Sequence, residues 1–419
     1  MKRRLRNAAL SLPFILIVAL GLRLDFAWHY ERPRPRQALA AIPFLQESGN
    51  VAYSLASGKG FSSPFRADTG PTAWLTPVYP LLLAGIFRLF GAYTFHAFLA
   101  AMGLNIFAST LTCVPIFFAG ERIAGRGIGA AGAWLWAVFP NAILLSVESM
   151  WDQSLGALLA AAILWATLAV EGSRRRRDWC GYGALWGLAL MTNPALVALL
   201  PILMGWLVYR ARRRASSVFL ALVVIVLCCA PWTARNYVVF HRFVPFRSVL
   251  GLSLWLGNNE HAEDRPVGRM HPIGNSAERD RYVVLGEMSY MREKESEAEH
   301  FMLAYPRTDL HFIADRFLEF WSGGTPRPFA DFVRFRSVWF RFVLLFNLAA
   351  AVGAFAGLVV LYQRRNIATI PAAAYILVFP CAYYLTLAIP RYRHPIDPAV
   401  LLLTALALQA VIRPARSGR

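Results

Sequence analysis

Eleven predominantly apolar runs constrain the fold of this chain more than any other feature of its sequence. A helix that crosses a bilayer needs about 20 mostly apolar residues. Charged residues make up only 16% of the chain, against about 25% in soluble globular domains. We therefore predict an all-α polytopic membrane protein. The runs cover residues 8–27, 75–91, 95–119, 127–147, 154–171, 180–192, 194–209, 215–232, 342–362, 367–389 and 398–413.

The basic clusters indicate how many of these runs cross the membrane. If all eleven crossed from a cytoplasmic N-terminus, the arginines at 174–177 and 210–214 would lie outside. The positive-inside rule opposes that arrangement. The run 75–91 is short and contains two prolines and an arginine, so it can lie along the outer interface. About ten transmembrane helices then remain, with both termini and every large basic cluster cytoplasmic.

The net charge of +19 has the same explanation. In a soluble protein, that charge would suggest binding to nucleic acid. Here the basic residues form short clusters between apolar runs, and no folded basic domain is present to bind a polyanion. We therefore predict the lipid bilayer as a partner and exclude nucleic acid.

The segment 180–209 is unusually short for two membrane crossings. Basic clusters bound it on both sides, so the chain must leave the cytoplasmic face and return to it. Two full crossings need about 40 residues, and Asn193-Pro194 interrupts the middle. Irregular backbone at membrane depth is tolerated where it lines a cavity or packs on protein. This segment therefore indicates an internal cavity beneath the outer face.

The acidic residues are concentrated in one region. Of the 24 Asp and Glu residues, 14 lie between Glu260 and Asp331. We predict a hydrated, mainly helical extracytoplasmic insertion there. The chain then divides into a transmembrane catalytic module at 1–232, which includes the first outer loop 28–94, the loop domain 233–340, and C-terminal transmembrane helices at 341–419.

Two carboxylates in predicted outer turns are candidates for catalysis. Residues 37–57 can form an amphipathic helix at the interface, on which Glu47 and Asn50 share a face. A lone Glu in such an apolar helix is costly unless it has a partner or a role, although it could be an ordinary interfacial carboxylate. Asp152 provides a second acid in the outer turn 148–152.

The last predicted outer turn is strongly basic. Arg391 and Arg393, followed by His394, lie on the side where the positive-inside rule predicts few cations. These side chains either snorkel at the interface or bind an anion, and the planar guanidinium suits phosphate. This arrangement suits an enzyme that uses a lipid-linked phosphate. The carboxylate would act as base on an acceptor hydroxyl. The arginines, and optionally a metal ion, would hold the phosphate leaving group.

Several motifs, in order along the chain, resemble one family. The sequence is similar to the multi-spanning C-type glycosyltransferases that depend on polyprenyl- or dolichyl-phosphate sugars, a group that includes protein O-mannosyltransferases and lipid A aminoarabinose transferases. The resemblance rests on a first-loop acid followed by Ala-x-x-Leu-Ala-x-Gly, on Thr-Pro-Val-Tyr-Pro leading to Leu-Phe-Gly, on Asp152, on the Asn193-Pro194 hairpin and on Arg-Tyr-Arg-His-Pro before the last helix.

This resemblance implies an inverting transfer in which a first-loop carboxylate is the base and the first outer loop contains horizontal helices. Glu47 takes the place of the base, Asp25 competes with it, and Asp152 matches the second acidic position. The family often has an acid pair where Glu47 stands alone, and a Lys where this chain reads Leu75-Thr76. The candidate substrate-binding residues are therefore Arg391, Arg393, His394, Lys59, Arg66, Tyr79 and Asn50.

The predicted function is transfer of a hexosyl or pentosyl group from a polyprenyl-phosphate donor to a hydroxyl or amine of a lipid, glycan or protein, on the periplasmic side of a bacterial inner membrane. No Asp-x-Asp pair appears, which argues against a tightly held divalent ion but leaves one open as a cofactor. One alternative is a transporter or flippase of a lipid-linked glycan, although acidic residues in the middle of the apolar runs and an internal repeat are not evident. Another is a non-catalytic scaffold, which would leave Glu47, Asp152 and Arg393 far apart.

Overall fold

The computed structural model has a helical architecture throughout the residues that it describes. Among them, the regular elements are helices, and one isolated bridge joins Ser62 to Pro71. The prediction of an all-α chain is confirmed. The basic residues at 211–214 and 413–419, and the end of the insertion at 324–337, lie outside the described part. The described residues are 10–31, 35–36, 38, 42–148, 150–210, 215–262, 267–323 and 338–412.

Six helical segments in the described residues are long and apolar enough to cross a membrane, and a bent pair makes a seventh. The chain is therefore an integral membrane protein. The bent pair consists of α8 (Arg126–Ala137) and α9 (Pro140–Glu148), which meet at 48°. The six segments are α2 (Leu12–Glu31), α6–α7 (Phe95–Leu111 and Cys113–Ala124), α10 (Gln153–Val170), α13 (Ala215–Phe240), α20 (Val338–Gln363) and η5–α23 (Pro390–Ile396 and Asp397–Ile412).

The other three of the ten predicted crossings are also helical but shorter. They are α11 (Arg176–Leu190), η2–α12 (Pro194–Leu199 and Leu200–Arg210) and α21–η4–α22 (Thr369–Ala373, Ala374–Val378 and Cys381–Leu385). The predicted break at Asn193 separates the first two. Its side chain caps η2 by accepting from the backbone N–H of Ala195.

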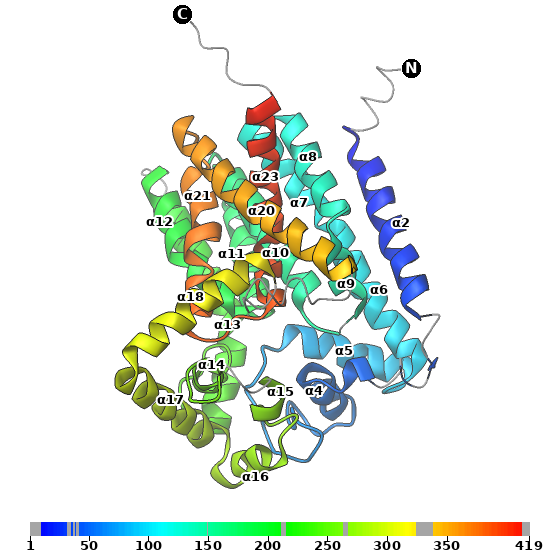
Figure 1. Ribbon diagram of the computed structural model, residues 1–419, viewed down its shortest axis with the longest axis vertical. Helices are drawn as coiled ribbons and strands as arrows, with labels where there is room; N and C mark the ends of the chain where they lie inside the picture. The colour runs from blue at the N-terminus through cyan, green and yellow to red at the C-terminus, as the bar shows by residue number, and fades with distance from the viewer. Residues whose placement is uncertain are drawn as a thin grey trace, which may run out of the picture.

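The short run that was predicted not to cross forms α5 (Val78–Phe90). Its 13 residues extend about 20 Å, which is too short for a hydrocarbon core of about 30 Å. Figure 1 shows α5 lying across the end of the bundle rather than along it. Helix α4 (Glu47–Ala56) packs against α5, and η1 (Ile42–Phe44) precedes α4. The expected horizontal helices of the first loop are therefore present.

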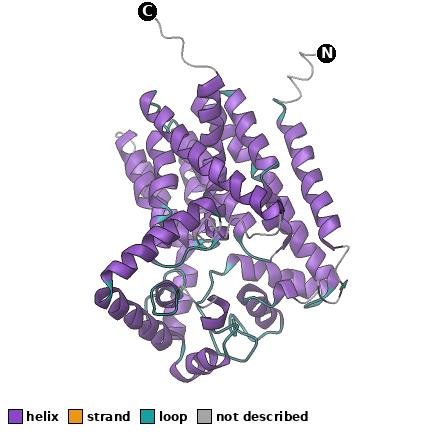
Figure 2. Cartoon of the chain, in the orientation of Figure 1, coloured by secondary structure: helices purple, strands orange, loops and turns teal. Residues whose placement is uncertain are grey.

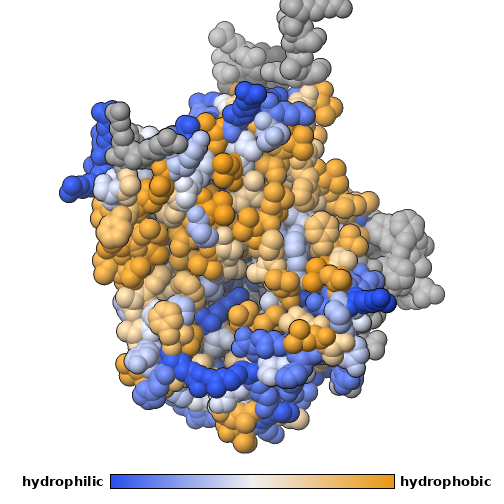
Figure 3. Space-filling view, turned by 90° about the vertical axis from the view of Figure 1, so that its left-hand side faces the viewer, coloured by the Kyte–Doolittle hydropathy of each residue, from blue (hydrophilic) through white to orange (hydrophobic). Residues whose placement is uncertain are grey.

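The insertion between α13 and α20 lies at the same end of the bundle, away from the start of α2 and the end of α23 (Figure 1). It is built almost wholly of helices and connecting loops (Figure 2). In Figure 3, a hydrophobic band covers the bundle, more hydrophilic residues lie below it, and the surface is hollowed where the two meet. The insertion helices are α14 (Leu250–Gly257), α15 (Val267–Met270), α16 (Ser276–Leu285), α17 (Glu287–Ala304) and α18 (Pro306–Ser322).

A small hydrophobic cluster joins the first loop to the insertion. Phe65 and Trp74 of the first loop are buried together with Leu252 of α14 and Tyr282 of α16. The rings of Phe65 and Trp74 meet edge to face, with centroids 4.7 Å apart. Aromatic pairs in this geometry stabilise a contact beyond the area that they bury. The cluster therefore brings two segments that are distant in the sequence to one side of a shared cavity.

Candidate active site

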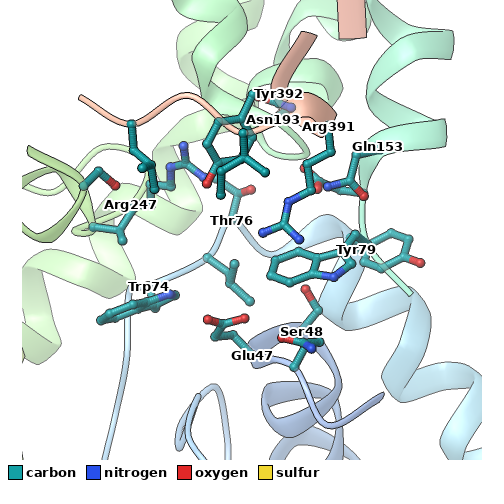
Figure 4. Close-up of a pocket in the computed structure, with 18 of the residues that line it drawn as sticks. Glu47, Ser48, Trp74, Thr76, Tyr79, Gln153, Asn193, Arg247, Arg391 and Tyr392 are labelled. Carbon is teal, nitrogen blue, oxygen red and sulfur yellow. The ribbon is translucent and has the colours of Figure 1, made fainter. Parts of the chain in front are cut away.

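A cavity of about 280 Å³ lies where the first loop, the insertion and the end of the bundle meet. This volume is near the lower end of the range for small-molecule sites, roughly 300–1,000 Å³. Figure 4 shows side chains from all three regions converging on it. Its polar lining residues are Gln46, Glu47, Ser48, Thr76, Tyr79, Asp152, Gln153, Thr192, Asn193, Arg247, Ser253, His271, Tyr383, Arg391 and Tyr392.

Glu47 provides a carboxylate that points into this cavity (Figure 4). It is the first residue of α4, where the partial positive charge of a helix N-terminus favours an anion. The side chain is only 6% exposed. Its Oε1 lies 3.3 Å from Nε2 of His271, while Oε2 is buried without a hydrogen-bond partner. A buried carboxylate oxygen without a partner is costly unless a substrate supplies one.

His271 is a site residue that the sequence analysis did not identify. It follows α15 in the insertion, far from Glu47 along the chain, and its ring lies between the edges of Phe65 and Trp74. Burial lowers the pKa of His271, the nearby Glu47 carboxylate opposes this shift, and Arg391 adds to it. A single histidine in a polar loop has no local signal that links it to a particular acid.

Asp152 lies on the cavity immediately before α10. Burial raises the pKa of Asp152, while the positive charges of Arg247 and Arg391 oppose the increase. Arg247 was not among the sequence candidates. The sequence could nevertheless have indicated it, because Arg247 is another cation on the outer side, where the positive-inside rule predicts few.

Arg391 contributes a cation from the opposite side of the cavity. Its guanidinium extends from η5 toward Glu47 (Figure 4). The Cζ atom lies 4.3 Å from the centroid of the Trp151 ring, within cation–π range. Its Nε has no hydrogen-bond partner. Arg391 is therefore held in place by an aromatic face and keeps donor capacity for an anionic ligand.

Arg393 and His394 do not line the cavity, although they follow Arg391 closely. Arg393 is 1% exposed, and its Nε donates to Asp397 at 2.7 Å. Its other nitrogens donate to the Trp321 carbonyl and to Asn347. His394 is fully buried, 3.3 Å from the same Asp397 carboxylate. Both side chains are thus engaged inside the bundle, because the short 3₁₀ turn of η5 directs neighbouring residues to different sides.

Lys59, Arg66 and Asn50 line a separate cavity of about 340 Å³ within the first loop. Lys59 and Arg66 are exposed. The buried Asn50 amide donates to the Pro64 carbonyl, so it holds the loop. The structure therefore does not bring these three candidates to the cavity that contains Glu47.

Tyr79 and Asp25 differ in their relation to the main cavity. Tyr79 lines it, and its hydroxyl donates to Asn105 at 3.1 Å. Asp25, in α2, is 72% exposed on its side chain, lies 3.6 Å from His29 and is not among the lining residues. Of the predicted candidates, the cavity thus brings together Glu47, Asp152, Arg391 and Tyr79.

The residues that the structure describes contain no group of three or more His, Cys, Asp or Glu side chains placed to share a metal ion. The cavity acids and His271 therefore do not form a three-ligand metal site.

Comparison with known proteins finds a family model that matches part of the chain and solved structures with a similar fold. The family model of dolichyl-phosphate-mannose-protein mannosyltransferases matches residues 73–234. The oligosaccharyltransferase AglB from Archaeoglobus fulgidus, solved with an inhibitory peptide and a dolichol-phosphate, is 15% identical over 97% of this chain and 52% of its own length, with a TM-score of 0.57. The same organism's oligosaccharyltransferase with Zn and sulfate is 14% identical over 96% and 49%, also with a TM-score of 0.57. No curated protein sequence matches significantly.

These matches confirm the resemblance to C-type glycosyltransferases that the sequence motifs predicted. The chain has the fold of this class of membrane proteins. It spans about half the length of the solved oligosaccharyltransferases that it matches.

Proposed function

We propose that this chain is a membrane glycosyltransferase that transfers a sugar from a polyprenyl-phosphate-linked donor to a hydroxyl or amine of an acceptor. One observation carries the proposal: the unpartnered Oε2 of buried Glu47 and the guanidinium of Arg391 occupy the same cavity from opposite sides. A base and a cation that line one cavity suit transfer away from a phosphate.

In the proposed reaction, Glu47 Oε2 accepts the proton of the acceptor hydroxyl as its oxygen attacks the anomeric carbon. The bond between that carbon and the phosphate oxygen breaks, and the bonding electrons leave with the polyprenyl phosphate. A single displacement inverts the configuration at the anomeric carbon. Positioned acid–base groups of this kind contribute about 10²–10⁴-fold to rate.

Arg391 and Arg247 supply positive charge for the leaving phosphate. Both line the cavity, and the positive charge of each favours the ionised form of the buried Asp152. Negative charge grows on the phosphate oxygens as the glycosidic bond breaks, so fixed cations stabilise the transition state more than the ground state. Asp152 in turn offsets the repulsion between the two arginines.

The position of the cavity suits a substrate with a lipid tail. It lies between the bundle and the insertion, and the surface in Figure 3 is hollowed where the hydrophobic band meets the polar part. We place this side at the periplasmic face of a bacterial inner membrane, with the termini cytoplasmic, on the evidence of the basic clusters near 126, 174–177 and 364–365. The catalytic module 1–232 and the loop domain 233–340 would each contribute to the cavity.

The known neighbours support this substrate class. The matched family is described by its use of dolichyl-phosphate mannose, and AglB was solved with a dolichol-phosphate and a peptide. For this chain, the proposed donor is a hexosyl or pentosyl group linked to a lipid phosphate. The proposed acceptor is a lipid, a glycan or a protein. The convergence of Glu47, Asp152 and Arg391 favours an enzyme over a scaffold or a flippase.

The test is a donor-turnover assay on protein purified in detergent. A panel of polyprenyl-phosphate sugars is offered with mixed acceptors, and released polyprenyl phosphate is measured for wild type, E47Q and D25N. We expect release by wild type and by D25N, and a loss on the order of a hundredfold or more in E47Q, the scale of a missing general base.

Each outcome separates the alternatives. Loss in D25N with normal turnover by E47Q would move the base to the first helix. Turnover unaffected by either change would move it to Asp152. Absence of release from every donor would count against the glycosyltransferase and favour a transport role.

A further inference from the structure

A hydrogen bond to His271 defines which of its ring nitrogens carries the proton. The backbone N–H of Ile273 donates to Nδ1 of His271 at 3.2 Å. A nitrogen that accepts a hydrogen bond bears no proton, so the proton of the neutral ring sits on Nε2. This tautomer follows from a backbone contact that does not depend on any ligand.

The protonated nitrogen faces the candidate base. Nε2 lies 3.3 Å from Oε1 of Glu47, whereas Oε2 of the same carboxylate has no partner. The two oxygens therefore differ: Oε1 lies beside the ring nitrogen that carries the proton, and Oε2 is unpartnered. The carboxylate as a whole points into the cavity (Figure 4). A carboxylate without such a contact could rotate about its terminal torsion, which has a broad energy minimum.

The surroundings hold the ring and favour its neutral form. The edges of Trp74 and Phe65 meet the imidazole, with ring centroids 5.3 and 5.9 Å away. The charged groups that act on it are Glu47 on α4 and Arg391 on η5. Burial lowers the pKa of His271 and Arg391 adds to this shift, and together they outweigh the opposing effect of Glu47. Protonation at Nδ1 would also remove the acceptor of the Ile273 N–H.

We propose that His271 is a positioning residue, which donates from Nε2 to Oε1 of Glu47 and thereby directs Oε2 toward the attacking group of the acceptor. This inference rests on the proposed function, because it assigns a partner to the proposed base. No proton is transferred to or from the histidine. The insertion therefore contributes a residue on which the base in the first loop depends.

The proposal predicts an effect on chemistry rather than on donor binding. Misplacing a reacting group by about 1 Å can cost roughly a hundredfold in rate. The donor phosphate is assigned to Arg391 and Arg247, so its binding should change little. A change in kcat with a nearly constant donor KM would separate positioning of the base from general damage to the cavity.

A pair of conservative variants tests the role of Nε2. The amide nitrogen of Gln can reach the place of Nε2, whereas that of Asn reaches only the place of Nδ1. We expect H271Q to retain kcat within a few-fold, and H271N to lower kcat about ten- to a hundredfold with little change in donor KM. In an E47Q background, H271N should cause no further loss, because the residue acts through Glu47.

The outcomes separate this inference from the proposed function. Equal kcat for H271N and wild type, or additive losses of H271N and E47Q, would overturn the positioning role while wild-type turnover preserves the function. Loss in H271Q as severe as in H271N, at equal melting temperature, would also overturn it. If wild type released no polyprenyl phosphate, both proposals would fall together.

Discussion

The carboxylate of Glu287 in the insertion accepts a 2.7 Å hydrogen bond from the backbone N–H of Ala73 in the first loop. The hydroxyls of Thr72, Ser248 and Tyr282 donate to the same carboxylate. Glu287, Thr72, Ala73 and Tyr282 are buried and Ser248 is half-buried, so the three buried donors have little access to water in place of this carboxylate. The residue after Ala73 is Trp74, which lines the cavity. This carboxylate therefore couples the insertion to the cavity wall.

Removal of the Glu287 carboxylate should destabilise the protein. E287A leaves three buried donors and the half-buried Ser248 hydroxyl without this acceptor, and each buried group costs about 1–3 kcal/mol. We expect a lower melting temperature in detergent and reduced donor turnover. E299A, at an exposed position of the same helix, is the matched control and should stay within about 0.5 kcal/mol of wild type. An unchanged melting temperature for E287A would contradict the coupling.

The two arginines of the last turn should respond to substitution in opposite ways. R391A removes a cation that faces the cavity, so donor turnover should fall about a hundredfold while the melting temperature stays near that of wild type. R393A breaks a fully buried ion pair with Asp397, which typically costs about 3–5 kcal/mol. Melting curves and turnover measured on both variants provide the check. A stable R393A or an unfolded R391A would refute these placements.

A single methyl group added at Gly257 should disturb the contact between α14 and the bundle. An added Cβ would meet the Thr386 carbonyl oxygen at 1.7 Å, so the two segments must move apart. Overpacking of this kind costs about 1–3 kcal/mol. Because α14 lines the cavity through Leu252 and Leu256, donor KM should rise as well.

The matched control for this change is G205A in α12. A Cβ there has no atom within 4 Å, and alanine favours a helix over glycine by up to about 1 kcal/mol. We expect G205A to melt at or above the wild-type temperature. Equal melting temperatures of G257A and G205A would contradict the prediction, because they would show that α14 can move away from Thr386 at little cost in stability.

The stability of the protein should decrease as the pH rises through the titration of Glu319. Burial raises the pKa of Glu319 from 4.5 to about 7, with Asp315 adding to the shift and Arg316 opposing it. A carboxyl whose pKa is raised by folding contributes stability below its unfolded pKa, and that contribution is lost as pH rises through the folded value.

The comparison with E319Q isolates this contribution, because glutamine does not titrate. Melting temperatures of both proteins are measured between about pH 5 and about pH 8. We expect the wild type to lose stability relative to E319Q as the pH rises. Parallel curves over this range would show that the Glu319 carboxyl titrates as it does in the unfolded chain.

The elements of this fold were predictable because their signal is local. Transfer of a run of apolar residues from water to lipid is favourable whatever lies elsewhere in the chain, so helices occur at the ten predicted crossings. The short length of 75–91 likewise predicted the horizontal α5. Six of the crossings, or seven with the bent pair, meet the length and apolarity of a full span. The remainder are shorter helices that pack on neighbouring helices.

The composition of the site depended on tertiary structure. The sequence alone was sufficient to select Glu47 as a carboxylate in an apolar segment and to mark the last turn as basic. It could not distinguish Arg391, which faces the cavity, from Arg393, which pairs with Asp397 inside the bundle. Nor could it pair Glu47 with His271, which comes from the insertion. Hydropathy reports the solvent that each segment prefers, whereas these contacts depend on the packing of distant helices, and that packing exists only in the folded chain.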